Sequence, residues 1–209
     1  FSEIRGTVSQ RQYSRWKKMA AENVFIGLPW PETATYRTWK SRTDNNLLDC
    51  YLLSLRMCDY LRSRAEVNRI VLKGASRSGP VVLVTAALDP TRILYVDAHV
   101  PTCMGISWTD KPYRGWGGRP GGVARDKYVA IARYVDPVNF APMLRVPFIT
   151  DCGIYDDLAP APGVIAFCNL AENAPWKRCS VEKGGHGFFT SGFRKQAHKE
   201  LAMYLKNQQ

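Results

Sequence analysis

Three side chains far apart in the sequence have the types and the order of a Ser-Asp-His site for nucleophilic chemistry. The first, Ser76, stands in Gly74-Ala75-Ser76-Arg77-Ser78, between a β-branched run and an apolar run with helical potential. Such a strand-to-helix turn, a nucleophile elbow, raises a serine hydroxyl above a sheet and directs a helix N-terminus at it. The usual pattern is Gly-x-Ser-x-Gly; here Ser78 replaces the last glycine and Gly79 follows. A serine-rich loop between strand and helix is the plain alternative for these residues alone.

A serine nucleophile needs a base, and the chain has three histidines. His99 lies at the end of an expected strand, and His198 lies on a charged face of the expected C-terminal helix. His186 lies in the glycine-rich loop Lys183-Gly184-Gly185-His186-Gly187, after a short strand and before the last helix. In doubly wound hydrolases the order along the chain is Ser, then Asp or Glu, then His. We therefore expect His186 to be the base.

Two adjacent aspartates could orient that histidine. Asp156 and Asp157 follow the expected strand 146–152 in a loop that contains Gly153. One of them can lie at the carboxyl edge of the sheet, where strand ends gather catalytic groups. A loop serine, a surface aspartate and a turn histidine are each commonplace alone. The combination is more informative: Ser76, Asp156 and His186 come in the correct order, each after a candidate strand. Together they favour a hydrolase.

The elements that must position these residues alternate between strands and helices. Leucine and other apolar residues at three- and four-residue steps predict a helix over 48–64, with Thr43 or Asp44 as its cap. The remaining expected helices lie at 10–23, from the elbow to Asp89, and at 126–134, 164–170 and 193–207. The expected strands lie before the elbow and at 93–100, 146–152 and 178–181. Such alternation predicts an α/β fold with a parallel sheet.

Composition limits the number of domains and the class of partner. The chain has 209 residues and 45% hydrophobic content, enough for one domain over residues 1–209. No run of eighteen apolar residues is present, so no membrane partner is expected. The net charge of +11 favours anionic partners. However, lysine and arginine are spread from Arg5 to Lys206 without a nucleic-acid-binding signature, which favours a generally basic surface over nucleic-acid binding.

The six cysteines lack the CxxC or Cys/His spacing of a metal site, so we expect no metal and no cofactor. An even count permits disulfides. Cys50, Cys58 and Cys168, however, lie in apolar helical stretches, where free cysteine acts as a small hydrophobe. We therefore expect mostly reduced thiols. The secreted and periplasmic compartments are favoured over the cytoplasm.

Several short motifs connect the chain to a known family. They are Asp136-Pro137-Val138-Asn139-Phe140-Ala141-Pro142, Val146-Pro147, Gly153-Ile154-Tyr155-Asp156, Pro160, Asn169-Leu170 and Gly185-His186, with Arg5-Gly6, Pro31-Glu32-Thr33 and Tyr36-Arg37 before them. On these residues the chain resembles the C-terminal portion of the acetyl xylan esterase and cephalosporin-C deacetylase family. The resemblance implies an α/β-hydrolase fold, a mostly parallel sheet with flanking helices. It also implies Ser76 as nucleophile, Asp156 as acid, His186 as base, and a homo-oligomer.

The chain departs from the family pattern around these residues. The family has Arg-Gly-Gln, Gly-x-Ser-Gln-Gly and His-Glu, where this chain has Arg5-Gly6-Thr7, Gly74-Ala75-Ser76-Arg77-Ser78 and His186-Gly187. The family's N-terminal strands, with the loop that donates a second oxyanion-hole amide, have no counterpart. We therefore expect a fragment or processed product, with the Arg77 amide as one oxyanion donor. Because a half-sheet exposes an edge, we also expect a separate N-terminal segment to complete the sheet.

The resulting hypothesis is a serine esterase that removes acetyl or similar small acyl groups from a small ester or an acetylated carbohydrate. Two alternatives stay open. One keeps the Ser-Asp-His site and changes the substrate to another ester or a peptide, since fold does not fix function. The other is a catalytically silent binding or assembly module, which the altered motifs favour.

Overall fold

The computed structural model describes residues 41–43, 45–108, 124–187 and 192–208. The chain divides into two compact units, Phe1–Thr33 and Ala34–Gln209, and every described residue belongs to the second. The expected helix at 10–23, the motifs before residue 41 and part of the loop 101–122 lie outside the described residues. A single domain over residues 1–209 therefore stays a prediction.

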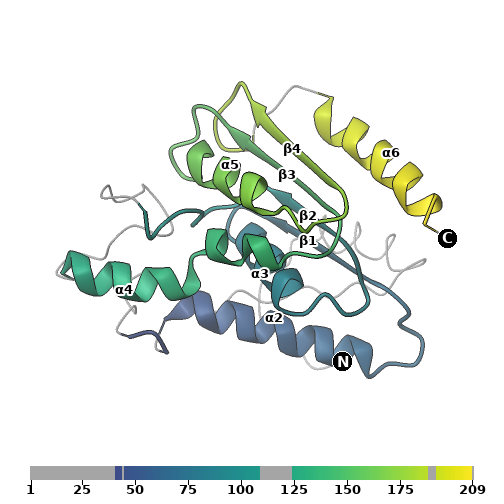
Figure 1. Ribbon diagram of the computed structural model, residues 1–209, viewed down its shortest axis with the longest axis horizontal. Helices are drawn as coiled ribbons and strands as arrows, with labels where there is room; N and C mark the ends of the chain where they lie inside the picture. Colours follow the sequence, from purple (N-terminus) through teal and green to yellow (C-terminus); the bar gives the residue numbers. More distant parts are fainter. Residues whose placement is uncertain (1–40, 44, 109–123, 188–191, 209) are drawn as a thin grey trace, which may run out of the picture. The chain divides into compact units, whose positions relative to one another are not determined.

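The described residues form a four-stranded parallel sheet in the order β1-β2-β3-β4. Its strands are β1 (Ile70–Ala75), β2 (Ile93–His99), β3 (Phe148–Gly153) and β4 (Lys177–Glu182). The helices are α2 (Asn46–Arg62), α3 (Ser78–Leu88), α4 (Arg125–Val135), α5 (Ala161–Leu170) and α6 (Phe193–Lys206), with a 3-10 helix η2 (Pro137–Met143). Helices therefore connect successive parallel strands, as predicted (Figure 1).

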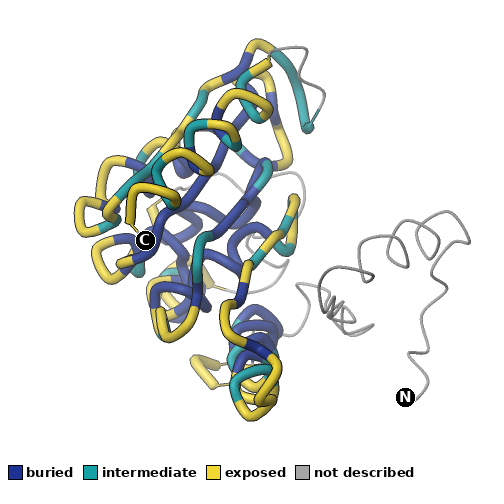
Figure 2. The backbone as a smooth tube through the Cα atoms, turned by 90° about the vertical axis from the view of Figure 1, so that its right-hand side faces the viewer, coloured by how far each residue is buried: buried dark blue, intermediate teal, exposed yellow. Residues whose placement is uncertain are grey.

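The helices cover the two faces of the sheet unequally. Helices α3 and α5 pack on one face, and α2 lies against α3. Helix α6 packs on the other face through Ala197 and Leu201, which contact Ile149 of β3. Strands β2 and β3 and helix α3 are mostly buried, whereas strand β4 and the outer surfaces of α4 and α6 are largely exposed, and Figure 2 shows this burial along the backbone.

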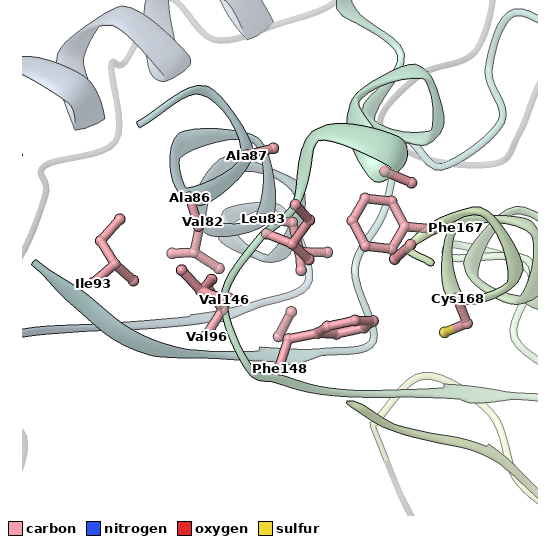
Figure 3. Packing of buried hydrophobic residues seen from close by; sticks show 14 of the residues in the cluster. Val82, Leu83, Ala86, Ala87, Ile93, Val96, Val146, Phe148, Phe167 and Cys168 are labelled. Atoms are coloured by element: carbon pink, nitrogen blue, oxygen red, sulfur yellow. The ribbon is translucent and has the colours of Figure 1, made fainter. Parts of the chain in front are cut away.

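The main hydrophobic core lies between the sheet and helices α3 and α5. Figure 3 shows Val82 and Leu83 of α3 against Val96 of β2 and Phe148 of β3. The ring of Phe148 meets the ring of Phe167 of α5 edge-on, with centroids 5.8 Å apart. Strand β3 is buried along its whole length. This buried parallel strand is therefore a rigid support for the loop that follows it.

Helix α2 begins two residues before the predicted start, and its cap is not the predicted Thr43; the other predicted cap, Asp44, lies outside the described residues. Asn45 is the cap, and its side-chain oxygen accepts a hydrogen bond of 2.8 Å from the amide of Leu48. Helix α5 also begins earlier than predicted, at Ala161. Pro162 stands in its first turn, where a missing amide hydrogen costs nothing.

Four of the six cysteines are free thiols, in line with the expectation of mostly reduced thiols, but the expectation that Cys168 is free is wrong. Cys168 of α5 and Cys179 of β4 form a disulfide across a sequence separation of 11 residues. The helical position of Cys168 concealed this, because only the fold brings strand β4 beside it. The other four cysteines are buried thiols: Cys50, Cys58, Cys103 and Cys152. Burial raises the pKa of the Cys103 thiol to about 12, which keeps it protonated and unreactive.

Replacing Cys168 and Cys179 together by alanine is expected to lower the free energy of unfolding by about 2–3 kcal/mol, because the cross-link restricts the unfolded chain. Urea unfolding without reductant measures this. The same loss should follow when the wild-type protein is unfolded in dithiothreitol. Equal stability of oxidised, reduced and doubly substituted protein would show that the cross-link contributes nothing.

Candidate active site

The segment around Ser76 has the backbone of a nucleophile elbow. Ser76 has φ of 52°, in the left-handed region that non-glycine residues rarely adopt. It stands between the end of β1 at Ala75 and the start of α3 at Ser78. Local strain of this kind concentrates at functional positions. The sharp turn thus presents the Ser76 side chain at the carboxyl end of a strand, as predicted.

The residues around the turn explain why Ser78 can replace the usual glycine. A Cβ on Gly74 would lie 2.4 Å from the carbonyl oxygen of Ser78, so strand and helix meet at Gly74. Ser78 itself has room for its side chain. Its hydroxyl lies 2.9 Å from both the amide nitrogen and the carbonyl oxygen of Ala75. The serine therefore closes the turn by hydrogen bonds instead of clashing with it.

Gly74→Ala is expected to lower the free energy of unfolding by about 2–3 kcal/mol, because the new methyl group must displace the backbone. Urea denaturation measures the loss. Gly192→Ala is the matched control, since a Cβ there meets nothing within 4 Å and the effect should stay within about 0.5 kcal/mol. Similar stabilities of the two variants would contradict the close approach at Gly74.

The imidazole of His186 lies between Ser76 and Asp156. Its Nε2 is 2.9 Å from the hydroxyl oxygen of Ser76, and its Nδ1 is 2.8 Å from Oδ2 of Asp156. The Asp156 side chain is fully buried, and the His186 side chain is 24% exposed. The structure therefore brings together all three residues chosen from the sequence. Asp157 is exposed, which decides between the two adjacent aspartates.

Backbone hydrogen bonds fix the Asp156 carboxylate. Its Oδ1 accepts hydrogen bonds from the amides of Leu158 (2.9 Å) and Ala159 (2.8 Å). This leaves Oδ2 for His186. The loop is tied to the chain that carries His186, because the amide of Tyr155 donates to the carbonyl oxygen of Gly184 at 3.0 Å. The acid and the base are thus held by one connected loop structure.

Helix α3 and the segment after β2 both hold the backbone of Ser76. The amides of Gly79 and Thr102 each donate to the carbonyl oxygen of Ser76 at 3.1 Å. Buried Asp136 holds this segment by accepting hydrogen bonds from Ser107 and Gly105. Burial raises the pKa of Asp136 above its ordinary value, even though these hydrogen bonds lower it. Sequence reasoning gave Asp136 only as part of a family motif, without this role.

Arg77 immediately follows Ser76 and is the last residue before α3. The position agrees with that of a helix N-terminal amide, but the part that this amide takes in binding an oxyanion stays a prediction.

A cavity of about 290 Å³ borders the elbow, lined in part by Ala75, Ser78 and Lys73. A second cavity, of about 510 Å³, lies at the start of α4, and none of its lining residues belongs to the Ser76, Asp156 and His186 group.

Sequence reasoning missed a second set of charged residues on the α6 side of the sheet. It comprises Asp97, His99, Asp151, Arg194 and His198. The signal was present but weak: Asp97 and His99 stand at alternate positions of β2, and Asp151 stands in β3, and both strands otherwise read as buried. We call these residues the α6 charge cluster.

The described part of the chain contains no group of three or more His, Cys, Asp or Glu side chains arranged to hold a metal ion. Among its helices, none has the length and apolar character needed to cross a membrane.

Comparison with known proteins shows the fold. No protein-family model and no curated protein matches the sequence. Among solved structures, an acetyl xylan esterase from Paenibacillus sp. R4 superposes with a TM-score of 0.67 at 19% identity, covering 99% of this chain and 71% of that one. Acetyl xylan esterase 1 from Thermoanaerobacterium sp. JW/SL YS485 gives 0.58 at 21% identity over 82% of this chain. A monoacylglycerol lipase from Paleococcus ferrophilus gives 0.51 at 14% identity, covering 75% of each chain.

These likenesses confirm the predicted α/β-hydrolase fold, with its parallel sheet and flanking helices. The chain spans 60% of the length of the Thermoanaerobacterium esterase. Esterases, a lipase and a puromycin hydrolase are all among the similar structures. The fold is therefore defined, and the reaction must be argued from the site.

Proposed function

We propose that this chain carries the nucleophile, base and acid of a serine ester hydrolase. The observation that carries the proposal is the His186 ring, which lies within hydrogen-bonding distance of both the Ser76 hydroxyl and the Asp156 carboxylate. A base in contact with its nucleophile and oriented by a third group is the arrangement that activates serine.

The geometry supports a two-step acyl transfer. Asp156 accepts the Nδ1 proton of His186 in a hydrogen bond, which leaves Nε2 unprotonated and able to take the Ser76 proton. The Ser76 oxygen then attacks the ester carbonyl, and His186 returns the proton to the leaving alcohol. Water attacks the acyl-enzyme with the same base, and the acid is released. The Asp156 carboxylate keeps its hydrogen bond to Nδ1 throughout and stabilises the imidazolium.

The developing oxyanion needs hydrogen-bond donors that are already in place. We propose the Arg77 amide as one donor, because it follows the nucleophile at the start of α3. Among the described strands, β1 is paired on one side only, with β2. We propose that a further segment beside β1 completes the sheet and supplies the second donor. Removing one such donor costs about a hundredfold or more in rate.

For the substrate we propose a small acyl group, such as acetyl, on a carbohydrate-like alcohol. The proposal rests on the motif resemblance and on the structural likeness to two acetyl xylan esterases. A homo-oligomer, which the resemblance also implies, belongs to the same proposal. The mechanism itself requires neither metal nor organic cofactor, because every proton transfer is assigned to a side chain of this chain.

Hydrolysis assays on matched substrates test the proposal. We expect turnover of p-nitrophenyl acetate and release of acetate from acetylated xylan, with p-nitrophenyl esters of long acyl chains cleaved more slowly. Preference for peptide p-nitroanilides would support the peptidase alternative, which the likeness to a puromycin hydrolase raises. No turnover of any of these substrates by the folded protein would support the silent module instead.

A further inference from the structure

The α6 charge cluster lies beside the proposed catalytic group on the face of the sheet that α6 covers. His99 of β2 and Asp151 of β3 are direct neighbours in the parallel ladder, so their side chains leave the sheet side by side. Asp97 lies two residues before His99 and shares that face. Arg194 and His198 are four residues apart on α6, which places both on one side of the helix.

Asp151 is the buried centre of this cluster. Its side chain is fully buried. Its Oδ1 lies 2.7 Å from Nδ1 of His99 and accepts the amide of Val100 at 3.1 Å, while its Oδ2 accepts Arg194 Nη1 at 3.0 Å. Burial alone raises the pKa of Asp151, but the hydrogen bond from His99 and the charge of Arg194 lower that pKa below its ordinary value. A charged Asp151 therefore holds the Nδ1 proton of His99 in a fixed direction.

The rest of the cluster ties α6 to the strand that ends in His99. Arg194 Nη2 donates to Oδ1 of Asp97, and Nε2 of His198 lies 2.9 Å from Oδ2 of the same aspartate. Nδ1 of His198 lies 2.7 Å from the carbonyl oxygen of Arg194. These contacts join Asp97 only to residues of α6. His99, in contrast, also contacts the segments that carry the proposed catalytic residues.

His99 contacts both the turn that carries Ser76 and the loop that carries His186. Its carbonyl oxygen accepts the amide of Ser76 at 2.8 Å. Its ring lies against the loop that carries the base: a Cβ placed on Gly187 would be 3.4 Å from Nε2 of His99. Gly187 follows His186 directly and has φ of 77°, a left-handed conformation that glycine adopts freely and other residues rarely adopt. His99 is thus the residue between the nucleophile turn and the histidine loop.

We propose that His99, oriented by Asp151, is a positioning residue that holds the His186 loop at the distance from Ser76 needed for proton transfer. The proposal rests on the proposed function of Ser76 and His186. It assigns the His99-Asp151 pair to alignment of the His186-Asp156 pair. A displacement of the base by about 1 Å is enough to lower the rate about a hundredfold.

His99→Asn and His198→Asn are the matched variants for a test. Asparagine at position 99 can place a donor near the site of Nδ1 and keep Asp151 satisfied, but it cannot fill the space beside Gly187. His198→Asn removes an imidazole from the same cluster without touching that loop. His99→Gln gives a second, independent change at the same position. Melting temperatures establish which variants are folded.

The readout that does not need activity is the proton NMR line of the His186 Nδ1 hydrogen, assigned by its loss in Asp156→Asn. We expect it to shift or broaden in both His99 variants and to stay as in wild type in His198→Asn. Alongside, kcat on p-nitrophenyl acetate should fall about tenfold to a hundredfold in the His99 variants, with KM within about twofold.

An unchanged His186 line in folded His99→Asn and His99→Gln would overturn the proposal, and so would an equal change in His198→Asn. Failure of the proposed function would give a different result in the activity assay. In that case the wild-type protein shows no turnover, while the NMR comparison still decides whether His99 positions His186.

Discussion

Replacing Ser76 by alanine is expected to lower kcat on p-nitrophenyl acetate at least about a thousandfold, because no other group in the site can form the acyl-enzyme. The fold should remain, since Ser76 contributes a small, half-buried hydroxyl and its left-handed backbone is held by hydrogen bonds from Gly79 and Thr102. Initial rates at saturating substrate measure the effect.

Ser78→Ala is the matched control for this prediction. Ser78 lies two residues away and its hydroxyl contacts only the backbone of Ala75 among the contacts described for it. Its loss is expected to cost about 1 kcal/mol of stability and to leave kcat within a few-fold of wild type. If both serine variants kept wild-type turnover, the activity would belong to another residue.

The second large effect is expected for Asp156→Asn, which should lower kcat about ten-thousandfold. The two amides of Leu158 and Ala159 fix an acceptor oxygen at Oδ1, so the asparagine must turn its NH2 group toward His186. That group donates to Nδ1 and favours the tautomer with the proton on Nε2. In that tautomer His186 cannot accept the proton of Ser76.

Asp157→Asn is the control for this substitution, because it makes the same chemical change at the exposed neighbouring residue. It should keep wild-type kcat, and both variants should melt near the wild-type temperature. A loss of activity in Asp157→Asn equal to that in Asp156→Asn would contradict the assignment of the acid.

The order of Ser76, Asp156 and His186 could be predicted from the sequence. Ser76 and Asp156 follow strands with visible apolar runs, and His186 lies in a glycine-rich loop after the short, more polar strand β4. Parallel strands end at one edge, so residues after separate strands meet there. The choice of Asp156 over Asp157 needed either the family motif or the coordinates. It depends on which carboxylate faces inward, and that is set by the turn at Leu158 and Ala159.

The α6 charge cluster and the disulfide could not be predicted from the sequence in the same way. Asp97 and Asp151 stand in strands that read as buried, and only the register of β2 against β3 places His99 beside Asp151. Cys168 and Cys179 belong to adjacent elements whose facing sides are set by packing. In each case the pairing depends on the tertiary structure, and no local sequence pattern predicts it.

The most direct test of the central claim is covalent trapping of the nucleophile. The folded protein is incubated with a fluorophosphonate, and the modified peptide is located by mass spectrometry. We predict a single adduct on Ser76, absent in Ser76→Ala and formed much more slowly in Asp156→Asn. Absence of an adduct on folded wild-type protein, or an adduct at another residue with Ser76 unmodified, would contradict the account.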